Sequence, residues 1–141
     1  MDILGIGTDI VECPRIGKMI EQHGEYFLRR VYTAREIRYC QARKHAIEHF
    51  AARWAAKAAI LKAMGTGWSR GIGWTDLEVR NRIGGSPEVL VCGAAKEIAR
   101  ELGIGEILVS ISHCRTYATA YAMAIGGPAS REAPVGQFPA S

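Results

Sequence analysis

The sequence predicts an α+β domain, with helices packed on a mainly antiparallel sheet. Two observations predict it: helical periodicity dominates residues 14–64, and short alternating segments separated by turns dominate residues 74–125. Such segregation of helices from strands is typical of this fold class. With 141 residues, 48% of them hydrophobic and 23% charged, the chain suits a single globular domain. We place this domain at residues 1–126 and expect residues 127–141, rich in Gly, Pro, Ala and Ser, to form a disordered tail.

The first expected elements are a strand and two helices. The apolar segment 3–7 predicts a short buried strand that ends near Asp9, and Pro14 can occupy the first turn of the helix that follows. Thr33 begins a capping-box pattern, which predicts a second helix from Thr33 to about Arg43. Asp9, at the end of a glycine-containing strand, is in a natural position to face a cleft, although a lone Asp is more often a turn or cap residue.

The longest helix is expected over residues 46–64, with an apolar stripe along one face and Gly65 as its C-cap. Basic residues flank this stripe, and we expect them to lie close to one another. At about 100° per residue, position 58 falls between the buried stripe and Lys62, where a side chain would point across the edge of a cleft. The stripe consists of Phe50, Trp54, Leu61 and Met64, and the basic residues beside it are Arg53, Lys57 and Lys62.

The second half of the chain is typical of strands with one short helix. Leu77 and Val79 alternate with charged residues, which indicates a half-buried strand, and the turn residues 84–87 predict a hairpin. In chain order we expect strands at Trp74–Arg82 and Glu88–Cys92, a helix at Ala94–Leu102, and strands at Ile107–Ser112 and Tyr117–Ile125.

Positive charge is concentrated between Arg15 and Lys62. This segment contains eleven Lys or Arg and four Glu, whereas the net charge of the whole chain is +4. It is either a solvated helical surface or a docking face for a nucleic acid, an acidic protein or a phosphorylated ligand. No recognised nucleic-acid motif or basic–aromatic array is present in the sequence, so we expect no nucleic-acid partner.

Signals for membrane insertion and for disulfide bonds are missing from the sequence. No apolar run approaches the roughly 18–20 residues that cross a bilayer, and no signal segment opens the chain. The cysteines have no regular spacing, which favours reduced thiols over a disulfide framework or a zinc site. We therefore expect a cytoplasmic protein with no membrane partner. The cysteines are Cys13, Cys40, Cys92 and Cys114.

Three short motifs suggest other chemistries, and each is incomplete. The Gly5–Gly7 segment lacks the third glycine of a dinucleotide-binding turn. The His45–His49 segment matches the H-x-x-E-H pattern of inverted zinc proteases, but nothing marks a third ligand, which favours a solvated helix terminus. The Ser110–His113 segment suggests a Ser–His hydrolase, but no G-x-S-x-G elbow occurs. We expect His113 to bind phosphate or to form a structural hydrogen bond instead.

Three linked motifs resemble those of one enzyme family. They are Gly5–Ile16, the helical segment Phe50–Gly67, and Ser110–Ala118. Their order and spacing are similar to those of holo-acyl-carrier-protein synthases, the small 4′-phosphopantetheinyl transferases, over about residues 2–126. The resemblance implies the α+β fold of these transferases and a reaction that moves the 4′-phosphopantetheine arm of coenzyme A to a serine of acyl carrier protein. It also implies a homotrimer with sites between subunits.

The resemblance assigns roles to individual residues. It implies a magnesium ion held by Asp9 and by the Glu of a Trp-x-x-Lys-Glu-Ala motif, whose place is taken here by Ala58. The implied catalytic set is Asp9, Lys62 and the vacated position 58. Coenzyme A would be bound by Arg53, Lys57, Lys62, Gly65 and His113, and the acyl carrier protein by Arg15 and Lys18.

Ala58 is the main departure from the family pattern, because a methyl group cannot bind magnesium. It is either a natural variation, as in a pseudoenzyme, or a replacement made in a working scaffold, and the intact motif around it favours the second. Loss of such an electrostatic element lowers a rate by about 10²–10³-fold, so we expect a weakened transferase. The alternative is a catalytically impaired protein that still binds coenzyme A and acyl carrier protein.

Overall fold

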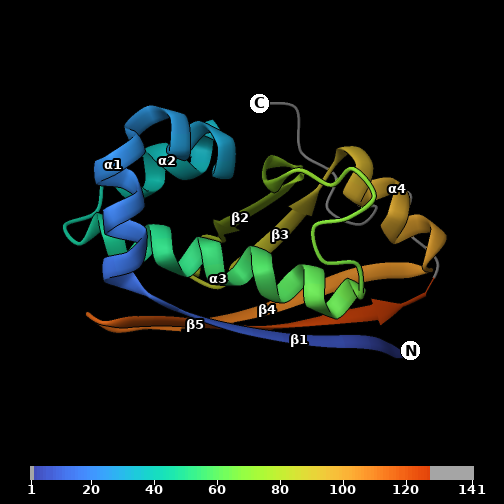
Figure 1. Cartoon of the computed structure of the whole chain (residues 1–141). Helices are drawn as coiled ribbons and strands as arrows, with labels where there is room; N and C mark the ends of the chain where they lie inside the picture. The colour runs from blue at the N-terminus through green and yellow to red at the C-terminus, as the bar shows by residue number, and fades with distance from the viewer. Residues whose placement is uncertain (1, 128–141) are drawn as a thin grey trace.

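The structure, a computed structural model, describes residues 2–127. The expected disordered tail, apart from Gly127, therefore lies outside the described residues. The α+β prediction is confirmed, with helices packed on an antiparallel sheet (Figure 1). In chain order the elements are β1 (Ile3–Glu12), α1 (Cys13–Val31), α2 (Ala34–Gln41), α3 (Ala46–Met64), the 3₁₀ turn η1 (Trp74–Asp76), β2 (Leu77–Asn81), β3 (Pro87–Val91), α4 (Gly93–Glu101), β4 (Ile104–His113) and β5 (Tyr117–Gly126).

The strands form two separate antiparallel sheets. A three-stranded sheet has the order β1-β5-β4, so the first and last strands of the fold are neighbours, and β2 and β3 form a hairpin of their own. Strand β1 is longer than the sequence predicts, because its polar second half still pairs with β5 as far as Glu12 opposite Tyr117. Helix α3 lies along one face of the three-stranded sheet, and the hairpin lies beyond it (Figure 1).

Small residues let α3 approach the sheet closely. The face of β5 toward the helix carries only buried alanines at alternate positions from Ala118 to Ala124. On β1, a Cβ atom added at Gly5 would collide with the carbonyl oxygen of Ala63, and one added at Gly7 would collide with that of Ala59. Glycine is needed at both places because the backbones of helix and strand meet there with no side chain between them.

Local signals in the sequence set the helix ends as expected. The side chain of Thr33 accepts a hydrogen bond from the Glu36 amide, and Glu36 accepts one from the Thr33 amide, which completes the predicted capping box of α2. Helix α3 has the predicted bounds, and Gly65 caps its end with a left-handed φ of 78°. Helix α1 is kinked at Gly24, where φ is 54°.

The other face of the three-stranded sheet is largely apolar and exposed. In a monomer such a surface is unusual and typically marks an interaction site. Among residues 2–127, no helix combines the length and the apolar character needed to cross a bilayer. The exposed apolar side chains on the three strands are Ile3, Leu4, Ile6, Ile10, Leu108, Tyr117 and Tyr121.

Candidate functional site

Asp9 and Lys62 meet at the edge of the sheet. Asp9 alternates in phase with Gly5 and Gly7, so it points from β1 toward α3, and its carboxylate oxygen Oδ1 lies 3.1 Å from Lys62 Nζ. The same ammonium donates to the carbonyl oxygen of Thr8 at 2.9 Å. Ala58 is one helical turn before Lys62 and is half-buried, so both residues project from the same side of α3. The structure thus brings together the three positions of the predicted catalytic set.

These residues fit a magnesium ion only in part. Asp9 supplies one carboxylate, which is already paired with Lys62, and Ala58 supplies no oxygen. Within residues 2–127, no group of three or more His, Cys, Asp or Glu side chains is arranged to hold a metal ion. Magnesium normally uses one or two carboxylates together with substrate oxygens and water, so Asp9 alone would make a weak site. The His45–His49 motif forms no zinc site among these residues either.

Gly65 leaves open space for a ligand, but its amide is not available as a hydrogen-bond donor. The amide of Gly65 donates to the Lys62 carbonyl at 3.0 Å, and the amides of Thr66 and Gly67 donate to the Leu61 carbonyl. These groups close the end of α3 and are not free to bind a phosphate. A side chain at Gly65 would have no neighbour within 4 Å, so the surface there is open.

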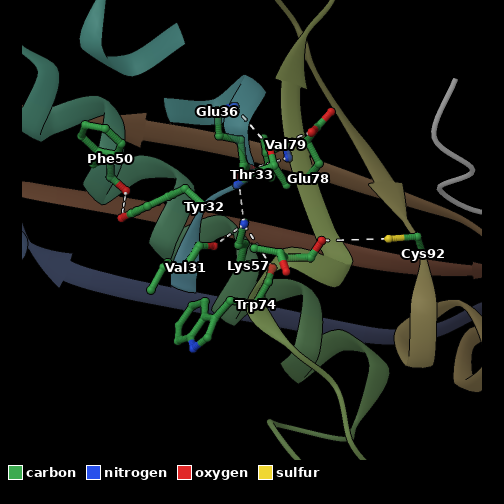
Figure 2. A network of polar contacts seen from close by, with 11 residues as sticks. Val31, Tyr32, Thr33, Glu36, Phe50, Lys57, Trp74, Glu78, Val79 and Cys92 are labelled. Carbon is green, nitrogen blue, oxygen red and sulfur yellow. Dashed lines mark hydrogen bonds and ion pairs between the residues drawn. The ribbon is translucent and has the colours of Figure 1, made fainter. Parts of the chain in front are cut away.

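Lys57 does not reach the surface, which corrects the expectation that it contacts coenzyme A. Its side chain has no exposed area, and its ammonium lies 2.7 Å from Glu36 Oε1. The ammonium also donates to the carbonyl oxygens of Val31 at 2.7 Å and Trp74 at 3.1 Å, which uses all three protons (Figure 2). The second oxygen of Glu36 accepts from the Val79 amide at 2.7 Å. Lys57 therefore joins the end of α1, helix α2 and the residues around β2.

Burial dominates the electrostatics of this network. Desolvation lowers the pKa of the Lys57 ammonium, and the neighbouring Glu36 carboxylate acts in the opposite direction. Burial raises the pKa of Tyr32, whose hydroxyl donates to the Phe50 carbonyl at 2.8 Å. The sequence predicts one apolar stripe on α3, but the helix is buried on almost every side. The inward direction of Lys57 therefore differs from the prediction.

Arg53 lies on the side of α3 away from Lys62 and faces two cavities. It is only 4% exposed, its Nη2 donates to Asn81 Oδ1 at 2.6 Å, and its guanidinium lies 4.2 Å from the centre of the Tyr39 ring. Its Nε is buried without a hydrogen-bond partner in residues 2–127. A buried donor without a partner is costly unless a ligand supplies an acceptor, so this guanidinium is suited to an anion.

The larger cavity has a volume of about 650 Å³ and is rich in arginine. Glu88 at its rim accepts hydrogen bonds from Arg80 at 3.0 Å and from Arg82 at 3.3 Å, which lowers the pKa of that carboxyl group despite its partial burial. The smaller cavity, of about 140 Å³, contains His113 and Arg53. The arginines that line the larger cavity are Arg35, Arg53, Arg80 and Arg82.

The predicted ligand-binding residues are divided between opposite flanks of α3. Arg53 and Lys62 are nine residues apart, which at about 100° and 1.5 Å per residue puts them about 180° apart around the axis and about 13.5 Å apart along it. Asp9 and His113 likewise lie on the two outer strands of the sheet, with β5 between them. The expectation that Arg53, Lys57 and Lys62 lie close to one another is therefore wrong, because Arg53 and Lys57, one turn apart, share a side of α3 that Lys62 does not.

The remaining predicted residues lie where the sequence suggests. Arg15 and Lys18 are exposed, and their spacing of three residues puts them on one face of α1. Ser110 and Ser112 are exposed and pair with Tyr121 and Thr119, on the sheet face away from α3. Side chains along β4 alternate between the two faces of the sheet, so His113 points to the face opposite that of Ser110 and Ser112. The serines and the histidine therefore do not form a hydrolase pair.

Sequence reasoning missed several side chains of the Arg53 cavities. Tyr39 and Asn81 come from α2 and β2, far from the helix in sequence, and nothing local marks them as neighbours of Arg53. His49 also lines the smaller cavity, although the sequence favours a solvated helix terminus for the His45–His49 segment. Its position one turn before Arg53, on the helix with the transferase-like motif, is the signal that points to it.

Comparisons with known proteins agree on one family. Residues 5–124 match the model of the 4′-phosphopantetheinyl transferase superfamily. The chain is 49% identical over 118 residues to the holo-[acyl-carrier-protein] synthase of Koribacter versatilis, covering 84% of this chain and 94% of that protein. Among solved structures, the holo-[acyl-carrier-protein] synthase of Neisseria meningitidis superimposes with a TM-score of 0.82 at 30% identity, covering 88% of this chain and 99% of that one.

A further solved structure holds a ligand. The holo-(acyl-carrier-protein) synthase of Bacillus anthracis, in complex with coenzyme A (3′,5′-ADP), has a TM-score of 0.74 and 32% identity over 89% of this chain and 98% of that one.

Proposed function

Because the chain belongs to the 4′-phosphopantetheinyl transferase superfamily, we propose that it transfers the 4′-phosphopantetheine arm of coenzyme A to a serine of apo acyl carrier protein. The serine oxygen bonds to the β-phosphorus, the bond from that phosphorus to the bridging oxygen breaks, and adenosine 3′,5′-bisphosphate leaves. The serine proton is lost in the same step. We take residues 1–126 as the transferase domain and the early basic segment, including Arg15 and Lys18, as the face that meets the acidic carrier.

The observation that carries this proposal is the exposed pair of Asp9 and Lys62 on a helix with the family motif. Lys62 is more than half exposed, so its ammonium can exchange Asp9 for the oxygens of a bound pyrophosphate. There it would offset the negative charge that develops on the leaving group. A magnesium ion, when bound, would supply further positive charge at the same oxygens. Asp9 is the residue that would hold it, and Ala58 stands where a second carboxylate would complete the ligands.

We further propose that two subunits of a homotrimer build each site. The opposed directions of Lys62 and Arg53 support this, because one chain cannot place both side chains against one coenzyme A molecule without wrapping it around α3. A neighbouring subunit can bring the Arg53 cavities to the Lys62 flank. The exposed apolar face of the three-stranded sheet is suited to burial between such subunits.

Substitution of Ala58 by glutamate tests the proposed function. With apo acyl carrier protein, coenzyme A and magnesium, the parent should raise the mass of the carrier slowly, and Ala58→Glu should do so about 10²–10³-fold faster. Magnesium should also bind Ala58→Glu more tightly in calorimetry. Ala58→Gln has the same size without the charge and should resemble the parent. Unchanged activity and magnesium affinity in Ala58→Glu would contradict the metal-ligand assignment.

The second candidate function is binding of coenzyme A and carrier protein without turnover. Ala58 favours it, since the site lacks one carboxylate. In that case the parent would bind coenzyme A but leave the carrier mass unchanged even over long incubation. Salt-sensitive binding to random DNA, with none to carrier protein, would contradict both candidates.

The shared site can be tested by mixing two inactive variants in the Ala58→Glu background. Lys62→Ala removes one half of the site and Arg53→Ala the other, so mixed trimers contain some sites with both halves intact. Activity should reappear on mixing and subunit exchange. Sites built within single chains would remain inactive, and light scattering on the parent gives the subunit number independently.

A further inference from the structure

Glu48 contacts His113, a residue of the smaller cavity, from outside that cavity. His113 Nδ1 lies 3.1 Å from Glu48 Oε1, and the two side chains are 30% and 18% exposed. His113 lines the cavity of about 140 Å³, whereas Glu48 does not. The carboxylate thus holds the ring from the side away from the space where a ligand would lie. Within residues 2–127 the other ring nitrogen, Nε2, makes no hydrogen bond.

Besides the hydrogen bond to Glu48, an aromatic contact restrains the His113 ring. The ring of His49 packs against that of His113 with centroids 5.0 Å apart, and Tyr39 packs against His49 at 5.8 Å. Burial lowers the pKa of His49, and the neighbouring His113, Arg53 and Arg43 act in the same direction. His49 contacts the His113 ring by packing, whereas the carboxylate of Glu48 contacts Nδ1 and so sets the orientation of the ring.

We propose that Glu48 is a positioning residue, whose carboxylate accepts a hydrogen bond from Nδ1–H of His113. This contact turns Nε2 toward an anionic group of the ligand, in the cavity that His113 shares with Arg53 and Asn81. The hydrogen bond of one ring nitrogen sets whether the other nitrogen carries a proton. With a proton on each nitrogen, the ring donates through Nδ1 to Glu48 and through Nε2 to the anion. The inference takes its ligand from the proposed function, under which the anion is a phosphate of coenzyme A.

The charged groups around the pair support this assignment. Arg53 lines the same cavity, and its buried Nε lacks a partner, so a phosphate there would meet two donors from different elements. Burial, and after it the charge of Glu48, raises the pKa of the Cys13 thiol, which donates to the Cys114 carbonyl at 3.7 Å and not to Glu48. Within residues 2–127 the hydrogen bond of the Glu48 side chain is the one to His113. His49 contacts His113 through ring packing, and within residues 2–127 the hydrogen bond of His113 Nδ1 is the one to Glu48.

The test measures binding of adenosine 3′,5′-bisphosphate by calorimetry, which needs no turnover. Partners that orient metal-bound histidines change affinity by about 10–100-fold, and by analogy Glu48→Leu should bind this nucleotide roughly tenfold more weakly than the parent. Glu48→Gln keeps an oxygen that can accept the Nδ1 proton and should stay within about threefold of the parent. Glu97→Leu makes the same change at an exposed residue of α4 that lines neither cavity, and it serves as the matched control, with affinity close to the parent's.

A double variant separates positioning from general damage. Glu48→Leu combined with His113→Gln should bind no more weakly than His113→Gln alone, because Glu48 acts through His113. Additive losses, or unchanged affinity in Glu48→Leu, would overturn the inference and leave the proposed function standing. If the parent itself binds neither adenosine 3′,5′-bisphosphate nor coenzyme A, the proposed function fails instead.

Nitrogen NMR of the parent keeps the inference testable even if Glu48→Leu does not fold. In neutral His113, the proton should reside on Nδ1 and Nε2 should be bare. The opposite tautomer in the parent protein would overturn the proposal without any variant and without any ligand.

Discussion

Helix α3 carries two lysine–carboxylate pairs, five residues apart, whose surroundings differ completely. Lys57 and Glu36 are 2.7 Å apart, and neither side chain has any exposed area. Lys62 and Asp9 are 3.1 Å apart, with side chains 56% and 18% exposed. The same two chemical groups thus occur once in the interior and once at the rim of a candidate active site.

The difference shows that direction on the helix, rather than residue type, decides what a lysine can do. The ammonium of Lys57 donates all three protons to protein acceptors. If it donated to a ligand instead, those buried acceptors would be left without a partner. Lys62 can give up Asp9 because water or a ligand is available to replace it. Buried pairs fix structure when intact and are costly to break, whereas exposed pairs contribute little to stability.

The largest expected loss in the free energy of unfolding follows from breaking the buried pair. Lys57→Ala leaves the Glu36 carboxylate buried without its cation, and breaking such a pair costs about 3–5 kcal/mol. Chemical denaturation, monitored by circular dichroism, should show this loss in the free energy of unfolding. In the double variant Lys57→Met/Glu36→Leu the buried charge is gone, and much of the stability should return.

The exposed pair supplies the control for this experiment. Lys62→Ala should change the free energy of unfolding by less than about 1 kcal/mol, because surface pairs are worth little. The same variant should lose most transferase activity in the Ala58→Glu background. Equal losses of stability in Lys57→Ala and Lys62→Ala would end the distinction between the two pairs.

A smaller effect is expected where the exposed flank is fixed to the sheet. Gly7→Ala puts a methyl group against the backbone of α3 at Ala59 and Ala63, and overpacking of this kind costs about 1–3 kcal/mol. Gly17→Ala is the matched control, since a methyl there meets only Ile47 at ordinary contact distance and alanine favours a helix. A Gly7→Ala protein as stable as Gly17→Ala would show that the close contact is not required.

The effect that is smallest at neutral pH is the alkaline response of the buried flank. Burial raises the pKa of Cys40 from 9.0 to about 12. Between these values the unfolded chain releases the thiol proton while the folded chain keeps it, so stability falls as pH rises above 9, by up to about 1.4 kcal/mol per pH unit. Cys40→Ala should flatten this slope in denaturation curves from pH 8 to 11. The exposed Cys114→Ala variant should follow the parent, and a Cys40→Ala slope equal to the parent's would contradict the assignment.

Local patterns predicted most of the secondary structure. The capping box at Thr33 and the glycine cap at Gly65 depend on neighbouring residues alone, and both helix ends lie where the sequence places them. The 3₁₀ turn Trp74–Asp76 replaces the start of a predicted strand, because alternation gives no sign that a segment begins to pair only at Leu77.

The sequence predicted which residues belong to the candidate site better than it predicted how they are arranged in space. Asp9, position 58 and Lys62 share one flank, as the helical period and the family pattern imply. The burial of Lys57 depends on Glu36 and Trp74, which come from other elements, so periodicity within α3 could not reveal it. The role we propose for Glu48 likewise depends on His113, 65 residues away in sequence.

The glycine contact between β1 and α3 has a consequence for redesign of this protein. Where two backbones touch, the spacing between Asp9 and position 58 is set by main-chain atoms and not by side-chain rotamers. The hydrophobic interior could therefore be rebuilt with other residues without shifting that spacing. If position 58 takes part in metal binding, as the proposed function holds, the choice of side chain there would alter metal specificity, because the distance it has to span is already fixed.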